Sequence, residues 1–541
     1  MTAKHDVFSS KFAQDIFLQK YSMNQQESWA DTCQRVVNTV CGQLLDNADK
    51  KKIYQYMLDR KFIPGGRYLY SAGRSFHQVN NCFLFRAEDS REGWADLMNK
   101  ATSALLTGGG IGVDYSAIRA EGALIKRTGG FCTGPISLME MINEAGRHIM
   151  QGGQRRSAIW AGLTWSHPDI NRFLSIKDYS PMLKAIKQQD FNFRLPVEFT
   201  NISVIYDTEF FVAIEDEKHE KHELAKDIWF KNCKQAFMSA EPGMSFNFCK
   251  DAESLRNACT EVVSEDDSDK CNLGTVWMNR CESRKEFGEV VKSATKFLLC
   301  GSIYSDVPTQ KIKDVGLKNN RIGLGLGGIH EWLMVRGHKY ECVPELHKWL
   351  ATYKRDSDEA AFVGAKHLNI AVPKGVRAIA PTGTIGIIAE TTTGIEPLFC
   401  KAYKRRYLKD GKWIHQFVVD GAVKRLLEQG VKLENIQDSY DISFKERVKF
   451  QADVQQYVDM AISSTCNMDS WGSSLNNEDT VKENAAVLLK YAKRLRGFTV
   501  YPDGCRGGQP LTRVSLEEAI NNEGKVFEEQ VNECIGGVCG I

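Results

Sequence analysis

The sequence predicts an α/β fold, because signals for helices and for strands alternate along most of its 541 residues. Before residue 62, apolar residues recur at helical spacing. From about residue 62 to residue 200, glycine-rich runs such as Thr107–Gly112 and Gln151–Gln154 interrupt the chain, which is typical of strands and helices joined by tight loops. Periodicity alone does not separate a closed barrel from an open sheet.

Each expected element has its own local signal. Residues 7–60 carry apolar side chains at helical spacing, among them Phe12, Ile16, Phe17 and Tyr21, and predict an opening layer of helices that serves as packing scaffold. Glycine, proline and alternating apolar residues mark the later boundaries. Helices are expected over 224–240, 286–304 and 481–495, strands over 244–248 and 497–501, and a charged linker over 506–533.

Bulk composition excludes some classes of function. The 70 Lys and Arg residues nearly balance the 68 Asp and Glu residues, so no global basic field favours nucleic acid. No apolar run approaches the roughly 18 residues that span a membrane, and residues 1–6 lack an apolar signal segment. The sixteen cysteines are therefore expected to be mostly reduced thiols of a cytoplasmic protein.

The most informative motif is Asn257-Ala258-Cys259-Thr260-Glu261. On an extended segment alternate side chains share one face, so an amide, a thiol and a carboxylate would be presented together. Taken singly, most other cysteines would be ordinary buried residues. Four of them nevertheless stand in Asn-rich, apolar or terminal runs that complete a set of five thiols suited to redox radical chemistry: Cys82, Cys271, Cys534 and Cys539.

In their order along the chain, these motifs resemble the catalytic large chain of ribonucleotide reductase from about Phe62 to the C-terminus. The points of resemblance are the Asn-x-Cys-x-Glu run, Cys271-Asn-Leu-Gly, Pro381-Thr-Gly-Thr-Ile385, Gly394-Ile-Glu-Pro397 and the terminal cysteine pair. The resemblance implies a ten-stranded α/β barrel threaded by a finger loop.

The same resemblance divides the chain into three parts. Residues 1–61 would form an N-terminal helical layer, 62–505 the catalytic barrel, and 506–541 a flexible tail that carries the redox cysteine pair. The layer leaves no room for the N-terminal ATP cone that many relatives carry, so overall control by ATP at such a domain is not expected.

The resemblance implies roles for the residues at the tip of the finger loop. Cys259 would be the transient thiyl radical that takes the 3′-hydrogen of a ribonucleotide. Glu261 would accept the 3′-hydroxyl proton as general base, and Asn257 would orient Glu261 and the sugar.

The other four cysteines would handle electrons. Cys82 and Cys271 would reduce the sugar while they close a disulfide. Cys534 and Cys539 on the mobile tail would reopen that disulfide and would in turn be reduced by thioredoxin or glutaredoxin. A metal clip, or a chance pair, is the alternative interpretation of the tail cysteines.

Ligand-binding residues are also implied. The loop Pro381–Ile385 resembles the one that binds substrate phosphates through glycine, threonine hydroxyls and backbone N–H groups. The substrate residues expected from the resemblance are Asn81, Thr382, Gly383, Thr384 and Ile385.

Three further residues match the positions where the family holds a deoxynucleotide or ATP effector: Asp89, Arg119 and Arg155. Such a site normally forms at a homodimer interface. Surface residues that form salt bridges would look the same in sequence.

The radical source is indicated by Thr499-Val-Tyr501-Pro-Asp-Gly504. This run resembles the adenosylcobalamin-dependent class II reductases, whereas chains that receive their radical from a ferritin-like metal-containing subunit carry two adjacent tyrosines here. Pro502 and Cys505 depart from the class II pattern, so the ferritin-like subunit remains an alternative. No His/Cys ligand set in the chain itself predicts a bound metal.

Two other functions stay open from the residues alone. A thiol-disulfide oxidoreductase would use only Cys534 and Cys539. A nucleotide-binding regulator would need only Asp89, Arg119 and the Thr382 loop. The choice between ribonucleoside diphosphates and triphosphates is also open.

Overall fold

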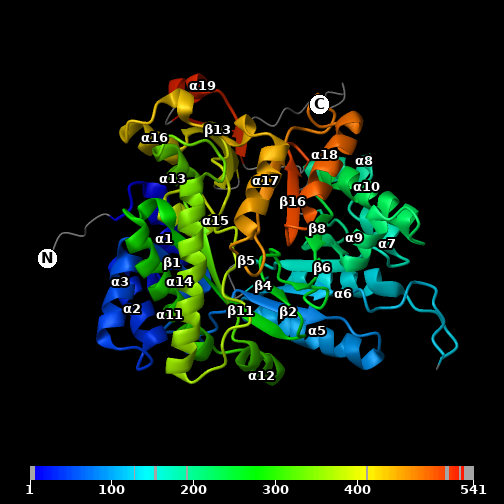
Figure 1. Ribbon diagram of the computed structural model, residues 1–541. Coiled ribbons are helices and arrows are strands. Elements are labelled where there is room, and N and C mark those ends of the chain that lie inside the picture. Colours follow the sequence, from blue (N-terminus) through cyan, green and yellow to red (C-terminus); the bar gives the residue numbers. More distant parts are fainter. Residues whose placement is uncertain are drawn as a thin grey trace.

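The computed structural model describes residues 7–126, 128–151, 155–189, 193–409, 412–505, 511–522 and 525–528. Cys534 and Cys539, the predicted redox pair of the tail, lie outside the described residues. Figure 1 shows helices arranged around a central sheet. The predicted α/β class is therefore confirmed.

One half of the central sheet is parallel. Its strands run in the order β2 (Cys82–Arg86), β3 (Gly110–Asp114), β6 (Ile159–Thr164), β7 (Thr200–Tyr206) and β8 (Gly243–Phe246). Nearly all of their residues are buried. Burial on both faces is what parallel strands covered by helices require.

The other half runs in the opposite direction. Strand β11 (Asp269–Trp277) pairs antiparallel with β2, and β16 (Gly497–Pro502) pairs antiparallel with β8. Strand β12 (Ile322–Gly327) is parallel to β11, and β15 (Thr465–Met468) is parallel to β16.

Two single bridges close the sheet. Leu324 of β12 pairs with Arg377, and Ile379 pairs with Ile462, just before β15. The segments around these residues connect the two edges of the ten-stranded sheet. The predicted ten-stranded α/β barrel is therefore confirmed. Its interior is enclosed by two half-sheets whose strands run in opposite directions.

The N-terminal segment is a helical layer, as the sequence predicts. It consists of α1 (Lys11–Lys20), α2 (Trp29–Cys41) and α3 (Asn47–Leu58). Ser10, Ser28 and Asp46 cap the three N-termini through their side chains. Phe12 does not belong to the buried face: it is 42% exposed, and the guanidinium of Arg405 lies 4.4 Å from its ring centroid.

The three helices predicted later in the chain are confirmed. They are α10 (His222–Ser239), α11 (Arg284–Tyr304) and α18 (Glu478–Ala492). Helix α11 packs between the N-terminal helices and the barrel, against α14 (Pro344–Leu368) and β11. Together with α2 and α3 it forms the larger of the two main hydrophobic cores.

The remaining described elements connect or cover these strands. The helices are α4 (Gly66–Ser71), α5 (Arg91–Leu106), α6 (Gly134–His148), α7 (Ile170–Ser175), α8 (Pro181–Gln189), α9 (Thr208–Glu215), α12 (Gln310–Asn319), α13 (Ile329–Val335), α15 (Gly383–Ala389), α16 (Gly421–Glu428) and α17 (Phe444–Gln455). The short strands are β1 (Phe62–Pro64), β4 (Met150–Gln151), β5 (Arg155–Arg156), β9 (Leu255–Arg256) and β10 (Val263–Ser264).

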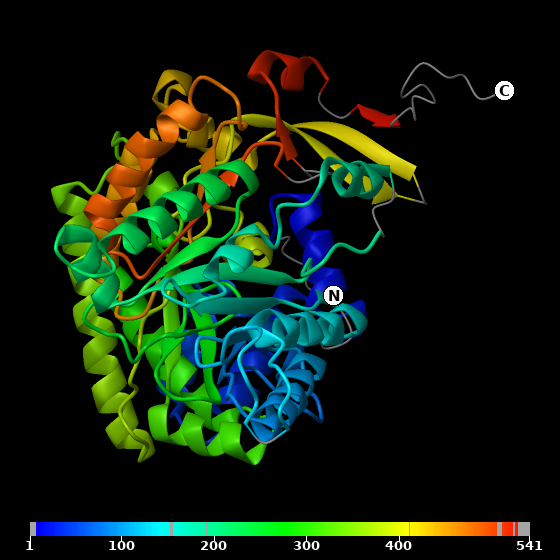
Figure 2. The same cartoon turned by 90° about the vertical axis from the view of Figure 1, so that its right-hand side faces the viewer.

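A second sheet corrects the prediction of a flexible tail. The hairpin of β13 (Ala402–Lys409) and β14 (Lys412–Val419) is flanked by β17 (Leu511–Arg513) and β18 (Val526–Glu528). Helix α19 (Leu516–Asn521) packs beside it and buries Ala519. Figure 2 shows this sheet at one end of the barrel. The linker prediction is wrong over these residues because their strand partners are a hundred residues away, where charge patterning carries no signal.

Candidate active site

A short hairpin inside the barrel carries the Asn-x-Cys-x-Glu motif. Strands β9 and β10 pair antiparallel, with Arg256 opposite Val263, and residues 257–262 form the tip. The loop touches both halves of the barrel. A Cβ at Gly112 of β3 would lie 1.8 Å from the carbonyl oxygen of Arg256, and the N–H of Ala461 donates to the carbonyl of Glu261 at 2.9 Å. The predicted finger loop is thus placed in the barrel interior.

Arg256 anchors the base of this finger loop. Its side chain is fully buried, and it donates to the side chain of Asn247 at 2.6 Å and to the carbonyl of Phe246 at 3.3 Å. It also donates to the carbonyls of Glu253 and Arg496. One guanidinium therefore joins the loop to the ends of β8 and β16.

The tip is a turn, which corrects the expected extended run. The N–H of Thr260 donates to the carbonyl of Asn257 at 3.0 Å, and Thr260 has a φ of 70°. The side chain of Asn257 accepts from the N–H of Val262 at 2.9 Å. The turn, rather than strand alternation, therefore sets the directions of the three functional side chains: Asn257 and Glu261 are buried, whereas Cys259 is exposed.

Asn257 also reaches the wall of the barrel. Its Nδ2 donates to Sγ of Cys82, at the start of β2, over 3.0 Å. The thiol of Cys82 in turn lies 4.0 Å from Oε1 of Glu261. The amide, one wall thiol and the carboxylate therefore form one contiguous group.

Cys82 and Cys271 face each other across β2 and β11, because their Cα atoms are partners in the antiparallel register. Opposite residues have Cβ atoms about 4.5–5.5 Å apart, close to the separation of about 3.5–4.5 Å in a disulfide. Burial is the main cause that raises the pKa of both thiols well above the usual value, and neighbouring acidic groups raise it further. Two neutral thiols are thus held in position to form a disulfide with little movement.

Glu261 is a buried carboxylate. It is 1% exposed, and burial raises its pKa to about 7 despite hydrogen bonding that favours the ionised form. No hydrogen-bond partner is found for its buried Oε2 within the described structure. A carboxylate with a pKa near neutrality and an available oxygen is suited to general base catalysis.

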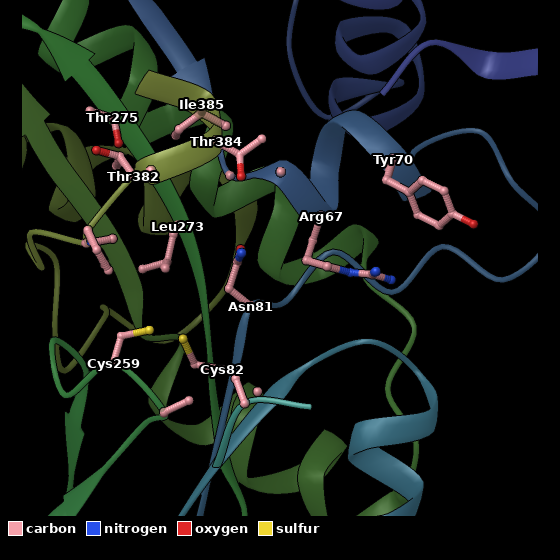
Figure 3. A pocket seen from close by; sticks show the side chains of 18 of the residues that line it. Arg67, Tyr70, Asn81, Cys82, Cys259, Leu273, Thr275, Thr382, Thr384 and Ile385 are labelled. Carbon is pink, nitrogen blue, oxygen red and sulfur yellow. The ribbon is translucent and has the colours of Figure 1, made fainter. Parts of the chain in front are cut away.

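These residues meet at a cavity of about 580 Å³. Cys82, Asn257, Cys259 and Glu261 line one part of it, and the predicted substrate loop lines another. Figure 3 shows the sulfurs of Cys82 and Cys259 pointing toward one another, below Thr382 and Thr384. The finger loop and the wall of the barrel therefore open onto the same space.

The five predicted substrate residues all line this cavity: Asn81, Thr382, Gly383, Thr384 and Ile385. Thr382 adopts a left-handed conformation and directly precedes α15, whose first residue, Gly383, has open space where a Cβ would be. Oδ1 of Asn81 is buried without a hydrogen-bond partner in the described structure. The loop is therefore shaped so that a polar ligand can approach its backbone closely.

The Gly394–Pro397 motif serves a structural purpose behind this loop. Glu396 accepts from Arg447 at 2.6 Å and from the N–H of Thr465 at 2.7 Å. Arg447 also donates to the hydroxyl of Tyr340. Because Arg447 is 4% exposed, this buried ion pair ties the motif to β15 and α17.

Several residues that line the cavity carry no sequence signal for a binding role. They come from the N-terminal layer, the start of the barrel and the turn after α5: Gln19, Lys20, Tyr21, Gly65, Gly66, Arg67, Tyr70 and Gly108. Helical periodicity identifies α1 as amphipathic but not which end of it meets a cavity.

The predicted effector residues lie away from the thiols. Nε of Arg119 donates to Oδ2 of Asp89 at 2.8 Å, and both side chains are about one-third exposed. Arg155 belongs to β5, which pairs with β4, and Ala158 three residues later lines the cavity. The structure brings Asp89 and Arg119 together, and their role as an effector site stays a prediction.

The described residues hold neither a metal cluster nor a membrane-spanning helix. No cluster of three or more His, Cys, Asp or Glu side chains there has the geometry to hold a metal ion. Among the helices described, none combines the length and the apolar character needed to cross a bilayer. None of the fourteen cysteines in this part of the chain forms a disulfide.

A closed α/β barrel with three thiols and a carboxylate at its interior loop is typical of an oxidoreductase. The family described as "Ribonucleotide reductase, barrel domain" matches residues 80–347 and 374–501. The chain therefore belongs to the ribonucleotide reductase family.

Three similar proteins are named as vitamin B12-dependent reductases. A "Vitamin B12-dependent ribonucleoside-diphosphate reductase" of Thermoplasma acidophilum is 26% identical, over 88% of this chain and 68% of the relative. A protein of the same name from Mycobacterium tuberculosis is 26% identical, over 88% of this chain and 75% of the relative. A "Vitamin B12-dependent ribonucleotide reductase" of Streptomyces clavuligerus is 24% identical, over 85% of this chain and 60% of the relative.

Proposed function

We propose that the protein reduces ribonucleotides to 2′-deoxyribonucleotides, with adenosylcobalamin as the source of the radical. The arrangement of Cys82, Cys259 and Glu261 around one cavity carries this proposal. The names of the relatives support the cofactor and do not favour a ferritin-like partner subunit. A thiol-disulfide oxidoreductase or a nucleotide-binding regulator would leave this arrangement without a purpose.

The exposure of Cys259 fits a large radical-generating group. Cys82, Cys271 and Glu261 are buried, whereas Cys259 at the tip of the finger loop is exposed. A bulky cofactor can therefore approach this thiol alone of the three, and the tip residues around Cys259 would contact it. Adenosylcobalamin, when bound, supplies an organic radical through cleavage of its cobalt–carbon bond.

The first step on the substrate belongs to Cys259 and Glu261. The Cys259 thiyl radical takes the hydrogen atom from the 3′ carbon and becomes a thiol again. Glu261 accepts the 3′-hydroxyl proton, for which its pKa of about 7 is suited. Asn257 holds the turn so that both side chains address the same sugar.

The second step removes the 2′-hydroxyl as water. Cys82 and Cys271 supply two electrons and two protons, and an S–S bond forms between them. The hydrogen atom then returns from Cys259 to the 3′ carbon, Glu261 returns its proton to the 3′ oxygen, and the thiyl radical is regenerated. The sum is ribonucleotide plus two thiols giving deoxyribonucleotide, water and a disulfide. The raised pKa values of both wall thiols keep them protonated for this role.

The remaining assignments follow from the same chemistry. We expect the pair Cys534 and Cys539 to reopen the disulfide, with electrons from thioredoxin or glutaredoxin. Because each turnover consumes thiols, we propose a cytoplasmic location, where thiols are kept reduced. Asp89, Arg119 and Arg155 are proposed to bind a deoxynucleotide or ATP effector at a homodimer interface.

Turnover without a partner protein tests the proposal. Purified protein is incubated with a ribonucleoside di- or triphosphate, adenosylcobalamin and a dithiol, and the deoxynucleotide is measured. We expect product from the wild type and none from Cys259→Ser, whose oxygen does not form the radical. Product from Cys259→Ser, or none from the wild type with any of the four common bases, would contradict the assignment.

A further inference from the structure

We propose that the N-terminal helix α1 forms part of the substrate site and that Lys20 at its end binds the terminal phosphate of the ribonucleotide. The inference rests on the proposed function and deepens it. It gives a binding role to a layer that the sequence indicates only as packing scaffold.

Side chains of both signs of charge line the cavity. Among the described residues that line it, the only acid is Glu261 and the only bases are Lys20 and Arg67. A ribonucleotide has a neutral sugar that reacts and an anionic phosphate chain. A cation beside the Thr382 loop would therefore mark the phosphate end.

Arg67 is turned away from the Thr382 loop (Figure 3). Its Nη2 donates to Oγ of Ser71 at 2.9 Å and to the carbonyl of Thr107 at 3.0 Å. Figure 3 shows its side chain reaching away from Thr382 and Thr384, toward Tyr70. Arg67 thus supports the wall formed by α4 and the turn after α5.

A clamp fixes the start of α1 at the far end of α15. Glu390 is the C-terminal cap of α15. Its carboxylate accepts from the N–H and hydroxyl of Ser9 at 3.1 and 2.7 Å, from the N–H of Ser10 at 2.9 Å, and from Arg60 at 2.6 Å. Ser10 is the residue that caps α1. The first turn of α1 is therefore held against the last turn of α15.

Helix length then decides where α1 ends. The two helices pack side by side, and the end of α1 lines the cavity together with the start of α15, so they run antiparallel. At a rise of about 1.5 Å per residue, the ten residues of α1 span about 15 Å and the seven of α15 about 10 Å. Lys20 consequently extends just past Thr382 and Gly383, where phosphates are expected.

The charge of Lys20 is needed at this position. The end of α1 presents backbone carbonyls, which repel an anion. An ammonium group on the last residue reverses the sign of the local potential and places three donors within reach of phosphate oxygens. The threonine hydroxyls and backbone of the Thr382 loop then bind the same phosphates from the opposite side.

Protection of Cys259 measures binding at this site without turnover or cofactor. Because Cys259 is exposed and lines the cavity, a bound ribonucleotide should shield it from iodoacetamide. The probes are cytidine, CMP, CDP and CTP, and labelling is quantified by mass spectrometry of the peptide. Cys249, which is also exposed, reports the intrinsic reactivity of the reagent.

We expect Lys20→Met to raise the CDP concentration for half-protection about tenfold, as for one charged hydrogen bond, and to leave cytidine unchanged. Lys20→Arg should retain most of the affinity. Lys11→Met, at the exposed start of the same helix, is the matched control and should bind CDP as the wild type does. Unchanged CDP protection in Lys20→Met, or an equal loss for cytidine, would overturn the proposal.

Glu390→Gln tests the clamp. It should also raise the CDP concentration for half-protection. The double variant with Lys20→Met should need no more CDP than Lys20→Met alone, because both substitutions remove the same contribution of Lys20 to binding. Additive losses would overturn the role of the clamp. If the wild type forms no deoxynucleotide but shows phosphate-dependent protection that requires Lys20, the proposed function fails while the phosphate contact stands.

Discussion

The side-chain amide of Asn257 donates to Sγ of Cys82 over 3.0 Å and thereby joins the tip of the finger loop to the first strand of the barrel. The same amide accepts from the N–H of Val262 and closes the turn that carries Cys259. One side chain therefore fixes the position of Cys259, the proposed radical thiol, relative to Cys82, the proposed reductant.

Replacement of Asn257 by alanine should impair both folding and catalysis. The buried N–H of Val262 would lose its acceptor, which costs about 1–3 kcal/mol, and the turn would lose its closure. We expect a lower free energy of unfolding by denaturant and at least a tenfold slower formation of deoxynucleotide. Asn201→Ala is the control, because Asn201 also contacts the tip, at the carbonyl of Ala258, but is exposed. Equal losses in both variants would contradict a special role for Asn257.

A single turnover should oxidise one particular pair of cysteines. With adenosylcobalamin, ribonucleotide and no external reductant, we expect the peptides of Cys82 and Cys271 to become disulfide-linked, because these residues face each other across β2 and β11. Non-reducing peptide mapping by mass spectrometry detects the link. Cys300, which is buried elsewhere in the core, should remain a thiol. A product formed without loss of the Cys82 and Cys271 thiols would refute their role.

Catalysis should depend on the ionisation of Glu261. The general base must be deprotonated, and burial raises its pKa to about 7. We therefore expect the turnover rate to rise with pH and to level off above about pH 7. Glu261→Gln should lose this step and most of the activity, by a factor of about 100 to 10,000. A rate that is flat between pH 6 and 8 would exclude Glu261 as the base in the rate-limiting step.

The same carboxylate should lower stability at high pH. Its pKa is about 4.5 when unfolded and about 7 when folded, so the folded state binds the proton more tightly and stability falls as pH rises through this window. Glu261→Gln removes that dependence. Between pH 4 and pH 8, the difference in free energy of unfolding between the variant and the wild type should shift in favour of the variant by up to about 3 kcal/mol. Denaturant unfolding at the two pH values measures this shift. The opposite trend would show that Glu261 is stabilised as a carboxylate.

The tail cysteines should limit repeated turnover. Replacement of both Cys534 and Cys539 by serine should permit about one turnover with the protein's own thiols as reductant, because the buried disulfide of Cys82 and Cys271 is inaccessible to a protein reductant. Rapid-quench measurement of deoxynucleotide per enzyme gives the stoichiometry. Sustained cycling of this variant with thioredoxin would refute the assignment of the tail.

Much of the site could be predicted from local motifs. Asn257, Cys259 and Glu261 are close in sequence, so any compact conformation keeps them together, and the resemblance correctly indicated the barrel around them. The extended conformation expected for this run was nevertheless wrong. The hydrogen bond from Val262 to Asn257 closes a turn, and that bond depends on a side chain rather than on strand alternation.

The described part of the tail shows where prediction from local sequence fails. Residues 511–513 and 526–528 look like a charged linker, yet they pair with the edges of the β13–β14 hairpin. Short strands of this kind are stabilised by hydrogen bonds to distant partners, and their own sequence carries little of that information.

The sequence by itself determined the class of fold, the thiol and carboxylate of the finger loop, and the loop before α15, because each depends on residue types at short spacing. Only the tertiary structure placed Cys82 opposite Cys271, buried Glu261 so that its pKa rises to about 7, and brought Lys20 to the same cavity as Cys259. These outcomes depend on strand register, desolvation and the relative lengths of packed helices. All three arise between segments that are far apart in the chain.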